Sequence, residues 1–228
     1  MNGTFATALL YSLLTLFVSY LIGSIPTGYL IGKCKGLDIR EHGSGNIGAT
    51  NVTRVIGKWW GKACFLGDFL KGALPVFLTS LLIRKGILAD QYGVLPSLAA
   101  FVTVAGHVWP IYLKFKGGKG ISTAAGAVLA LNPPALLGAG VLWVVLFLTS
   151  RYVSLASIFA ALSLPFFAWG FLHWKVWECS KMEMILFGLL AILAVIRHIS
   201  NIKRLLNGTE SRFERKKKDS GEEKKEEA

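Results

Sequence analysis

Two long stretches without any charged residue constrain the fold of this chain more than any other feature. Met1 to Gly32 contains no Asp, Glu, Lys or Arg, and neither does Gly120 to Ser150. A transmembrane helix needs about 20 consecutive apolar residues, and runs of this kind are typical of membrane spans. Across all 228 residues, 53% are hydrophobic, 17% are charged and the mean hydropathy is +0.53. The sequence therefore predicts an all-α membrane protein that crosses the bilayer several times.

Seven transmembrane helices are expected from the apolar runs and the breaks between them. The run 121–149 is too long for one comfortable span, and Asn132-Pro133-Pro134 divides it, because successive prolines remove backbone donors and disfavour a continuous helix. The expected spans are Phe5–Ile25, Trp59–Ile83, Tyr92–Leu113, the two halves of 121–149, Val153–His173 and Met182–Ile199. Residues 1–203 would form this helical domain. Residues 204–228 would form a charged cytoplasmic tail, disordered at least beyond Phe213.

The distribution of lysine and arginine among the loops predicts the orientation. One set of loops and the tail hold most of the basic residues, whereas the loops at the other end hold only Arg84, Lys85, Lys175 and Lys181. Because cytoplasmic loops carry an excess of Lys and Arg, the N-terminus is expected outside and the C-terminus in the cytoplasm. The net charge of +12 then fits contact with anionic membrane lipid, and no nucleic acid is expected as a partner.

Four polar clusters fall on the predicted cytoplasmic face, and the first of them, Glu41–Arg54, is rich in glycine. Its glycines allow the backbone to turn N–H groups around an oxyanion, and Arg54 offers a planar guanidinium that fits phosphate or carboxylate. The glycines match the GxGxxG spacing, but a dinucleotide site needs a preceding strand that this chain does not offer. The cluster instead suggests capture of a phosphorylated molecule. Small hydroxyl and amide side chains complete it: Ser44, Asn46, Thr50 and Asn51.

The second cluster is the loop Lys114–Gly120, which precedes an apolar helix. Its GGKG sequence resembles a P-loop but lacks the serine or threonine that such a motif requires directly after the lysine. What remains is a glycine bend at a helix N-terminus with lysines beside it. Such an arrangement binds anions without any nucleotide-binding fold, so a phosphate site is expected here.

The last two clusters follow Arg151 and Arg197. Ser154 either caps a helix or faces the site. His198 and Asn201 are three residues apart and therefore share one face of the last helix. There His198 would be a base, a donor to phosphate or an interfacial anchor.

Three ionisable residues lie inside the expected spans. Asp68 and Lys71 are either an ion pair that locks helix packing or a contact to substrate, since charges within a membrane face the bundle interior or a wet cavity. His107, near a helix end, is more typical of a packing or hydrogen-bonding residue than of a catalyst. The sequence has no HExxH pattern or paired histidines, so neither a metal nor another cofactor is expected.

Taken together, these clusters resemble the bacterial acyl-phosphate:glycerol-3-phosphate acyltransferase family. The resemblance implies an enzyme of phospholipid synthesis in the bacterial cytoplasmic membrane, with seven helices and a site that faces the cytoplasm. Such an enzyme transfers a fatty acyl group from acyl phosphate to the 1-hydroxyl of glycerol 3-phosphate and forms lysophosphatidic acid. The matching segments follow the family's order along most of the chain: 23–33, 43–54, 67–72, 106–123, 150–157 and 197–210.

The resemblance also implies roles for individual residues. The residues expected to be catalytic are Ser44, Arg54, His198 and Asn201, and those expected to bind substrate are Asn46, Thr50, Asn51, Lys116, Gly117, Gly118, Lys119 and Ser154. The resemblance does not decide between Lys116 and Lys119 for phosphate, or between Ser154 and Ser157. The general base is His198 or the donor's own phosphate. Substrate assistance is favoured, because no carboxylate is expected to orient a histidine.

A transporter or flippase for a phosphorylated solute is the alternative function. It would also need basic, glycine-rich clusters within a helical bundle. However, the chain shows no inverted repeat, and its polar clusters gather at one side instead of at the bilayer midplane. The acyltransferase is therefore the favoured interpretation.

Overall fold

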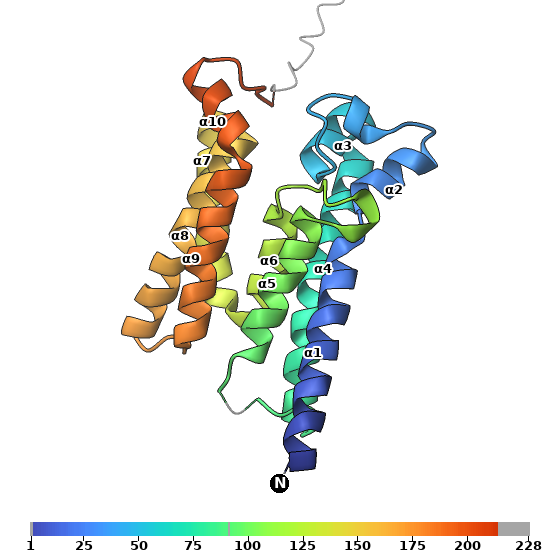
Figure 1. The fold of residues 1–228 in the computed structure, drawn as a ribbon. Helices are drawn as coiled ribbons and strands as arrows, with labels where there is room; N and C mark the ends of the chain where they lie inside the picture. Colours follow the sequence, from blue (N-terminus) through green and yellow to red (C-terminus); the bar gives the residue numbers. More distant parts are fainter. Residues whose placement is uncertain (1, 91, 214–228) are drawn as a thin grey trace, which may run out of the picture.

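The computed structural model describes residues 2–90 and 92–213, and within them every regular element is a helix (Figure 1). The tail residues 214–228, for which disorder is expected, lie outside the described residues. The helices that run along the bundle are α1 (Asn2–Ser24), α4 (Lys58–Arg84), α5 (Leu95–Val108), α6 (Ile121–Leu131), α7 (Pro133–Ser150), α8 (Val153–His173) and α9 (Lys181–Arg197). Short helices gather at the end opposite to the N-terminus: α2 (Thr27–Cys34), η1 (Ile39–Glu41), α3 (Ala49–Val55), η2 (Ile111–Leu113) and α10 (Ile199–Leu206).

Several of these helices have the length and composition of membrane spans. Five described segments are long and apolar enough to cross a bilayer, and the number rises to six if the bent pair of α9 and α10 is one span. Helix α6 has 11 residues and is therefore only about 16 Å long, which is short for a span. The structure thus shows a multi-helix membrane protein. The number of seven spans and the orientation of the termini remain predictions.

The long uncharged run is divided where the sequence predicts. Helix α6 ends at Leu131, and α7 begins with Pro133 and Pro134. Between them, the Asn132 side chain accepts a hydrogen bond from the N–H of Ala135 at 3.1 Å. A proline costs little in the first turn of a helix, where its missing N–H would have no partner inside the helix. The same prolines therefore end one helix and start the next.

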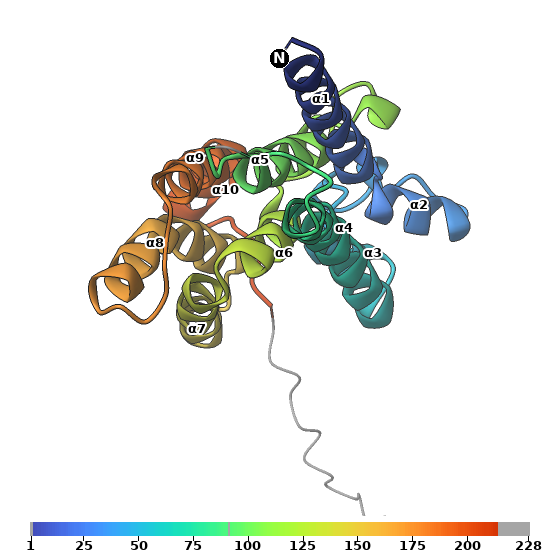
Figure 2. The ribbon, with the colours of Figure 1, turned by 90° about the horizontal axis from the view of Figure 1, so that it is seen from below.

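Glycines allow the helices to pack closely at two crossings. A Cβ atom at Gly72 of α4 would overlap the carbonyl oxygen of Thr123 on α6, and one at Gly126 of α6 would overlap a carbonyl of α4. Helix α1 packs on α5 in the same manner, through Gly23 and Gly106. Small residues are the usual means of close helix contact in a bilayer, where apolar burial provides little driving force. Figure 2 shows the resulting group of α1, α4, α5 and α6, with α7, α8 and α9 beside it.

The polar residues of the spans are turned inwards. Among the buried side chains are Asp68, Lys71, Thr103, His107 and Thr123, whereas many large apolar side chains are exposed on the outside of the helices. This distribution is the one that a hydrocarbon environment requires. Residues 27–58, the polar segment between the first two expected spans, contain the short helices α2 and α3. Ile39, Val52 and other apolar residues form a small core beneath these short helices.

Candidate active site

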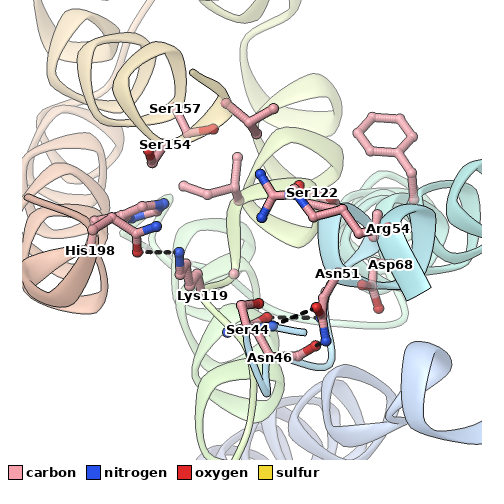
Figure 3. Close-up of a pocket in the computed structure, with 18 of the residues that line it drawn as sticks. Ser44, Asn46, Asn51, Arg54, Asp68, Lys119, Ser122, Ser154, Ser157 and His198 are labelled. Atoms are coloured by element: carbon pink, nitrogen blue, oxygen red, sulfur yellow. Dashed lines mark hydrogen bonds between the residues drawn. The ribbon is translucent and has the colours of Figure 1, made fainter. Parts of the chain in front are cut away.

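A cavity opens at the end of the bundle where the short helices lie. Its walls come from segments that are distant in sequence: α3 and the loop before it, α4, α5, the N-terminus of α6, α7, α8 and α10 (Figure 3). The predicted site residues that line it are Ser44, Asn46, Thr50, Asn51, Arg54, Lys119, Ser154, His198 and Asn201. Three predicted residues do not line it: Lys116, Gly117 and Gly118. The tertiary fold therefore brings together most of one predicted site.

Asn51 organises the first glycine-rich loop. Its Nδ2 donates hydrogen bonds to the carbonyl oxygens of Ile39, His42 and Asn46, at 3.2, 3.0 and 2.9 Å. Its Oδ1 accepts from the N–H of Ser44 at 2.9 Å. Because Asn51 is buried and its polar atoms are engaged within the protein, it shapes the loop that carries Ser44 into the cavity.

Arg54 lies at the mouth of the cavity on α3. Its Nη2 donates to the backbone oxygen of Ser211 at 3.1 Å, and its guanidinium lies 5.2 Å from the ring centre of Phe213. A guanidinium over an aromatic face is held by cation–π attraction while its other N–H groups stay available. Figure 3 shows Arg54 and Lys119 reaching towards the cavity from opposite walls. The two cations therefore flank a space suited to an anion.

Lys119 is the lysine of the second loop that reaches the cavity, whereas Lys116 is exposed. Its Nζ donates to Oδ1 of Asn201 on α10. Burial lowers the pKa of Lys119 to about 8, and the positive charges of Arg204, Arg54 and Arg197 act in the same direction, against the opposing effect of Glu210. Lys119 is therefore a cation at neutral pH that loses its charge as the pH rises through about 8.

The N–H groups of Gly117 and Gly118 point away from the cavity. They donate to the carbonyl oxygens of Val108 and His107, at 3.2 and 3.1 Å. The carbonyl oxygens of the same two glycines accept from the guanidinium of Arg197, at distances from 3.1 to 3.3 Å. Both glycines are thus bonded to other parts of the protein. Backbone donors for an anion come instead from the first turn of α6, where N–H groups have no partner within the helix. Ile121 and Ser122 of that turn line the cavity.

His198 and Asn201 lie on the opposite wall, and both are buried. The Nδ1 of His198 is 2.8 Å from the carbonyl oxygen of Ala194. Because a carbonyl only accepts, Nδ1 carries the proton and Nε2 is the nitrogen that can accept another. The histidine is therefore oriented by its own helix and not by a carboxylate.

Glu210 is a site residue that the sequence analysis missed. Its Oε1 accepts from Ser154 at 2.7 Å and from Asn201 at 2.6 Å, and its Oε2 accepts from Arg204 at 2.7 Å. Burial alone would raise the pKa of Glu210, but the hydrogen bonds from these three partners outweigh it, and the pKa is lowered. A charged Glu210 therefore joins α8 to α10. Ser157 also lines the cavity, and its hydroxyl accepts from the indole N–H of Trp143.

The charged residues of the spans form one buried group at the floor of the cavity, where Asp68 and His107 are lining residues. Lys71 Nζ lies 2.8 Å from Asp68 Oδ1 and donates to the carbonyl oxygen of Ile25 at 2.6 Å. The same Asp68 oxygen is 3.6 Å from Nδ1 of His107. Asp68 therefore lies beside His107, at a distance longer than a hydrogen bond, while Nδ1 of His107 pairs with Thr123. The packing of α4 against α5 brings this pair together across a sequence gap that gives no local signal.

An apolar groove adjoins the cavity. It lies between α4, α6, α7 and α8, and it shares Phe65, Ile121, Trp143 and Ser157 with the polar cavity. Farther along, its walls are almost entirely aliphatic and include Gly140 of α7. The site therefore combines a cationic chamber with an apolar extension that runs between helices.

Comparison with known proteins gives consistent matches along nearly the whole chain. The family described as glycerol-3-phosphate acyltransferase matches residues 13–208. A glycerol-3-phosphate acyltransferase of Desulforudis audaxviator is 46% identical over 204 residues, which cover 88% of this chain and 95% of the relative. One from Geobacter sulfurreducens is 43% identical over 208 residues, which cover 90% and 99%.

Two solved structures are also similar. Both are of PlsY, described as an integral membrane glycerol 3-phosphate acyltransferase. Its glycerol 3-phosphate form has a TM-score of 0.78 at 38% identity and covers 90% of this chain and 96% of that one. Its lysophosphatidic acid form has a TM-score of 0.76 at the same identity and coverage.

Proposed function

The chain belongs to the glycerol-3-phosphate acyltransferase family, and on that premise we propose that it transfers a fatty acyl group from acyl phosphate to the 1-hydroxyl of glycerol 3-phosphate. The products are lysophosphatidic acid and phosphate. The observation that carries this function is the cationic cavity of Arg54 and Lys119 joined to an apolar groove. A phosphorylated polar acceptor and a phosphorylated fatty acyl donor need both environments, with the reacting carbonyl where they meet.

Arg54, Lys119 and the first turn of α6 provide the positive potential for the two phosphate groups. These groups stabilise the negative charge that develops on the carbonyl oxygen and on the leaving phosphate. Ser44, Asn46 and Thr50 supply further polar contacts from the first loop. Asn51 shapes that loop.

The acyl transfer itself needs no covalent enzyme intermediate, because acyl phosphate is already activated. The 1-hydroxyl oxygen attacks the carbonyl carbon, and the bond from that carbon to the phosphate oxygen breaks. The hydroxyl proton passes to the donor's phosphate or to Nε2 of His198. Substrate assistance is favoured, since His198 bonds to a backbone carbonyl and burial lowers its pKa to about 4, against the opposing effect of Glu210. Asn201 holds Lys119 in place, and Glu210 holds Ser154.

Placement in the membrane follows from the distribution of charge. We propose seven passes, counting α6 as a short one, with the N-terminus outside and the cavity at the cytoplasmic surface of a bacterial inner membrane. The clustering of Lys and Arg around the cavity end supports this orientation. The acyl chain of the donor would then enter the groove laterally from the lipid.

The test is acyl transfer by the purified protein in detergent or lipidic mesophase. Palmitoyl phosphate and glycerol 3-phosphate are supplied, with acyl-CoA and acyl carrier protein donors in parallel. Lysophosphatidic acid and phosphate should form with palmitoyl phosphate, and Arg54→Ala should abolish the reaction. Turnover only with the thioester donors would overturn the assignment of acyl phosphate as the acyl donor. Binding of glycerol 3-phosphate without turnover on any donor would favour a transporter instead.

A further inference from the structure

The ring of His107 fills the space directly behind the second glycine loop. On one side, its Nδ1 lies 3.1 Å from the hydroxyl of Thr123 and 3.6 Å from Oδ1 of Asp68. On the other side, its Nε2 faces Gly118 so closely that a Cβ atom added there would overlap it. Asp68, His107 and Thr123 come from α4, α5 and α6, and all three are buried. The ring, which belongs to α5, therefore lies between α4, α6 and the loop.

The loop in turn holds Lys119. Gly118 donates through its N–H to the backbone of His107 and accepts through its carbonyl from Arg197, and the His107 ring packs against the face between these two bonds. The next residue is Lys119, whose side chain lines the cavity. Any shift of Gly118 is passed on to Lys119, because the two share a peptide bond.

We infer that His107 is a positioning residue, which sets the location of Lys119 through the contact of its ring with Gly118. Thr123 fixes the orientation of the ring through Nδ1, Asp68 lies beside the same nitrogen, and Lys71 balances the buried charge of Asp68. This role rests on the proposed function, in which Lys119 binds phosphate. His107 also lines the cavity, but because Nδ1 contacts Thr123 and Nε2 lies against the backbone of Gly118, it holds the loop and does not act as the general base.

Different atoms exclude a side chain at each of the two neighbouring glycines. At Gly118, an added methyl group would meet the His107 side chain. At Gly117, it would meet main-chain oxygens of His107 and Val108 and the ring of Pro110. Removing the His107 ring therefore creates room for alanine at position 118 but none at position 117. This difference supplies a matched control.

The experiment measures acyl transfer for His107→Ala, Gly118→Ala, Gly117→Ala and the two double variants that combine His107→Ala with each glycine change. A displacement of about 1 Å in a positioned group costs on the order of 100-fold in rate, so each glycine variant should lose about that much kcat/KM for glycerol 3-phosphate. His107→Ala alone should lose about 10-fold, chiefly as a higher KM for glycerol 3-phosphate, with the KM for palmitoyl phosphate unchanged.

The double variants decide the outcome. His107→Ala with Gly118→Ala should recover to about the level of His107→Ala alone, whereas His107→Ala with Gly117→Ala should lose the product of the two single losses. If the losses of the single variants multiplied in both double variants alike, the inference would be overturned. A rise in the KM for both substrates in His107→Ala would also overturn it.

If Gly118→Ala does not fold, the same comparison is made on the yield of monodisperse protein, which His107→Ala should restore for Gly118→Ala only. If the wild type transfers no acyl group, the proposed function fails. The recovery of folded protein then still tests the contact between His107 and Gly118.

Discussion

The lowered pKa of Lys119 predicts a fall of activity in alkaline solution. Burial favours the neutral amine, so the side chain is charged below about pH 8 and loses its charge as the pH rises through that value. About nine-tenths of the free enzyme carries this charge at pH 7 and about one-tenth at pH 9. Since only the charged form attracts phosphate, kcat/KM for glycerol 3-phosphate should fall about tenfold between these two values. The substrate contributes little to this change, because its phosphate has a second pKa of about 6 and is already about nine-tenths dianionic at pH 7.

The effect belongs to kcat/KM, which reports the ionisation of the free enzyme, and should be weaker in kcat, because bound phosphate stabilises the charged lysine. Lys119→Arg keeps the charge at all these pH values and should flatten the profile. Lys119→Met should lower kcat/KM about 30-fold at pH 7, from the loss of a charge-assisted hydrogen bond worth about 2 kcal/mol. Its activity should not vary between pH 7 and pH 9.

The assay follows lysophosphatidic acid formation across this pH range, with the spontaneous hydrolysis of palmitoyl phosphate subtracted. Lys116→Ala is the matched control, since this exposed lysine lies outside the cavity and its removal should leave the profile unchanged. A wild-type profile that stays level up to pH 10 would refute the reasoning. So would an equal fall in Lys119→Arg, because the titrating group would then be another one.

Three further changes test the fold around the site. Asp68→Asn and Lys71→Met should each lower the free energy of unfolding by about 3–5 kcal/mol, because each leaves a buried partner unpaired. In thermal unfolding, the double variant should lose less stability than the sum of the two single losses. Gly126→Leu should abolish folded protein, since the new side chain would overlap a carbonyl oxygen of α4. Position 140 has open space around it and lines the apolar groove, so Gly140→Leu should fold but raise the KM for palmitoyl phosphate. Glu210→Ala should lower the free energy of unfolding by about 2 kcal/mol, a modest value because Arg204 is partly exposed. Chemical denaturation measures this change, and an unchanged midpoint would show that the hydrogen bonds of Glu210 do not stabilise the fold.

The helical character of this chain is predictable because hydrophobicity is a local property. Each apolar run forms a helix wherever its residues lie in the fold, since a bilayer leaves no other way to satisfy the backbone. The break at Asn132-Pro133-Pro134 is equally local, because proline limits the residue before it and its own N–H. The short helices α2 and α3 are different. They are stabilised by a small core that draws residues from separate segments, and the sequence analysis predicts no helix between the first two spans.

The residue types of the site are also visible in the sequence. Glycine, serine, asparagine, arginine and lysine gathered in the loops of one side are what phosphate binding needs, and the resemblance to a known family named nine residues that do line the cavity. Composition and order along the chain therefore decide what kind of ligand the site accepts.

Which residue does what was decided only by the tertiary structure. Lys119 and Lys116 look alike in the sequence, and the path of the backbone after Gly118 turns just one of them into the cavity. Glu210 stands in a stretch that reads as the start of a tail, and its bond to Ser154 joins residues 56 positions apart. Asp68 reaches His107 only through the packing of α4 on α5. A contact between distant segments depends on how whole helices pack, and no pattern within either segment contains that information.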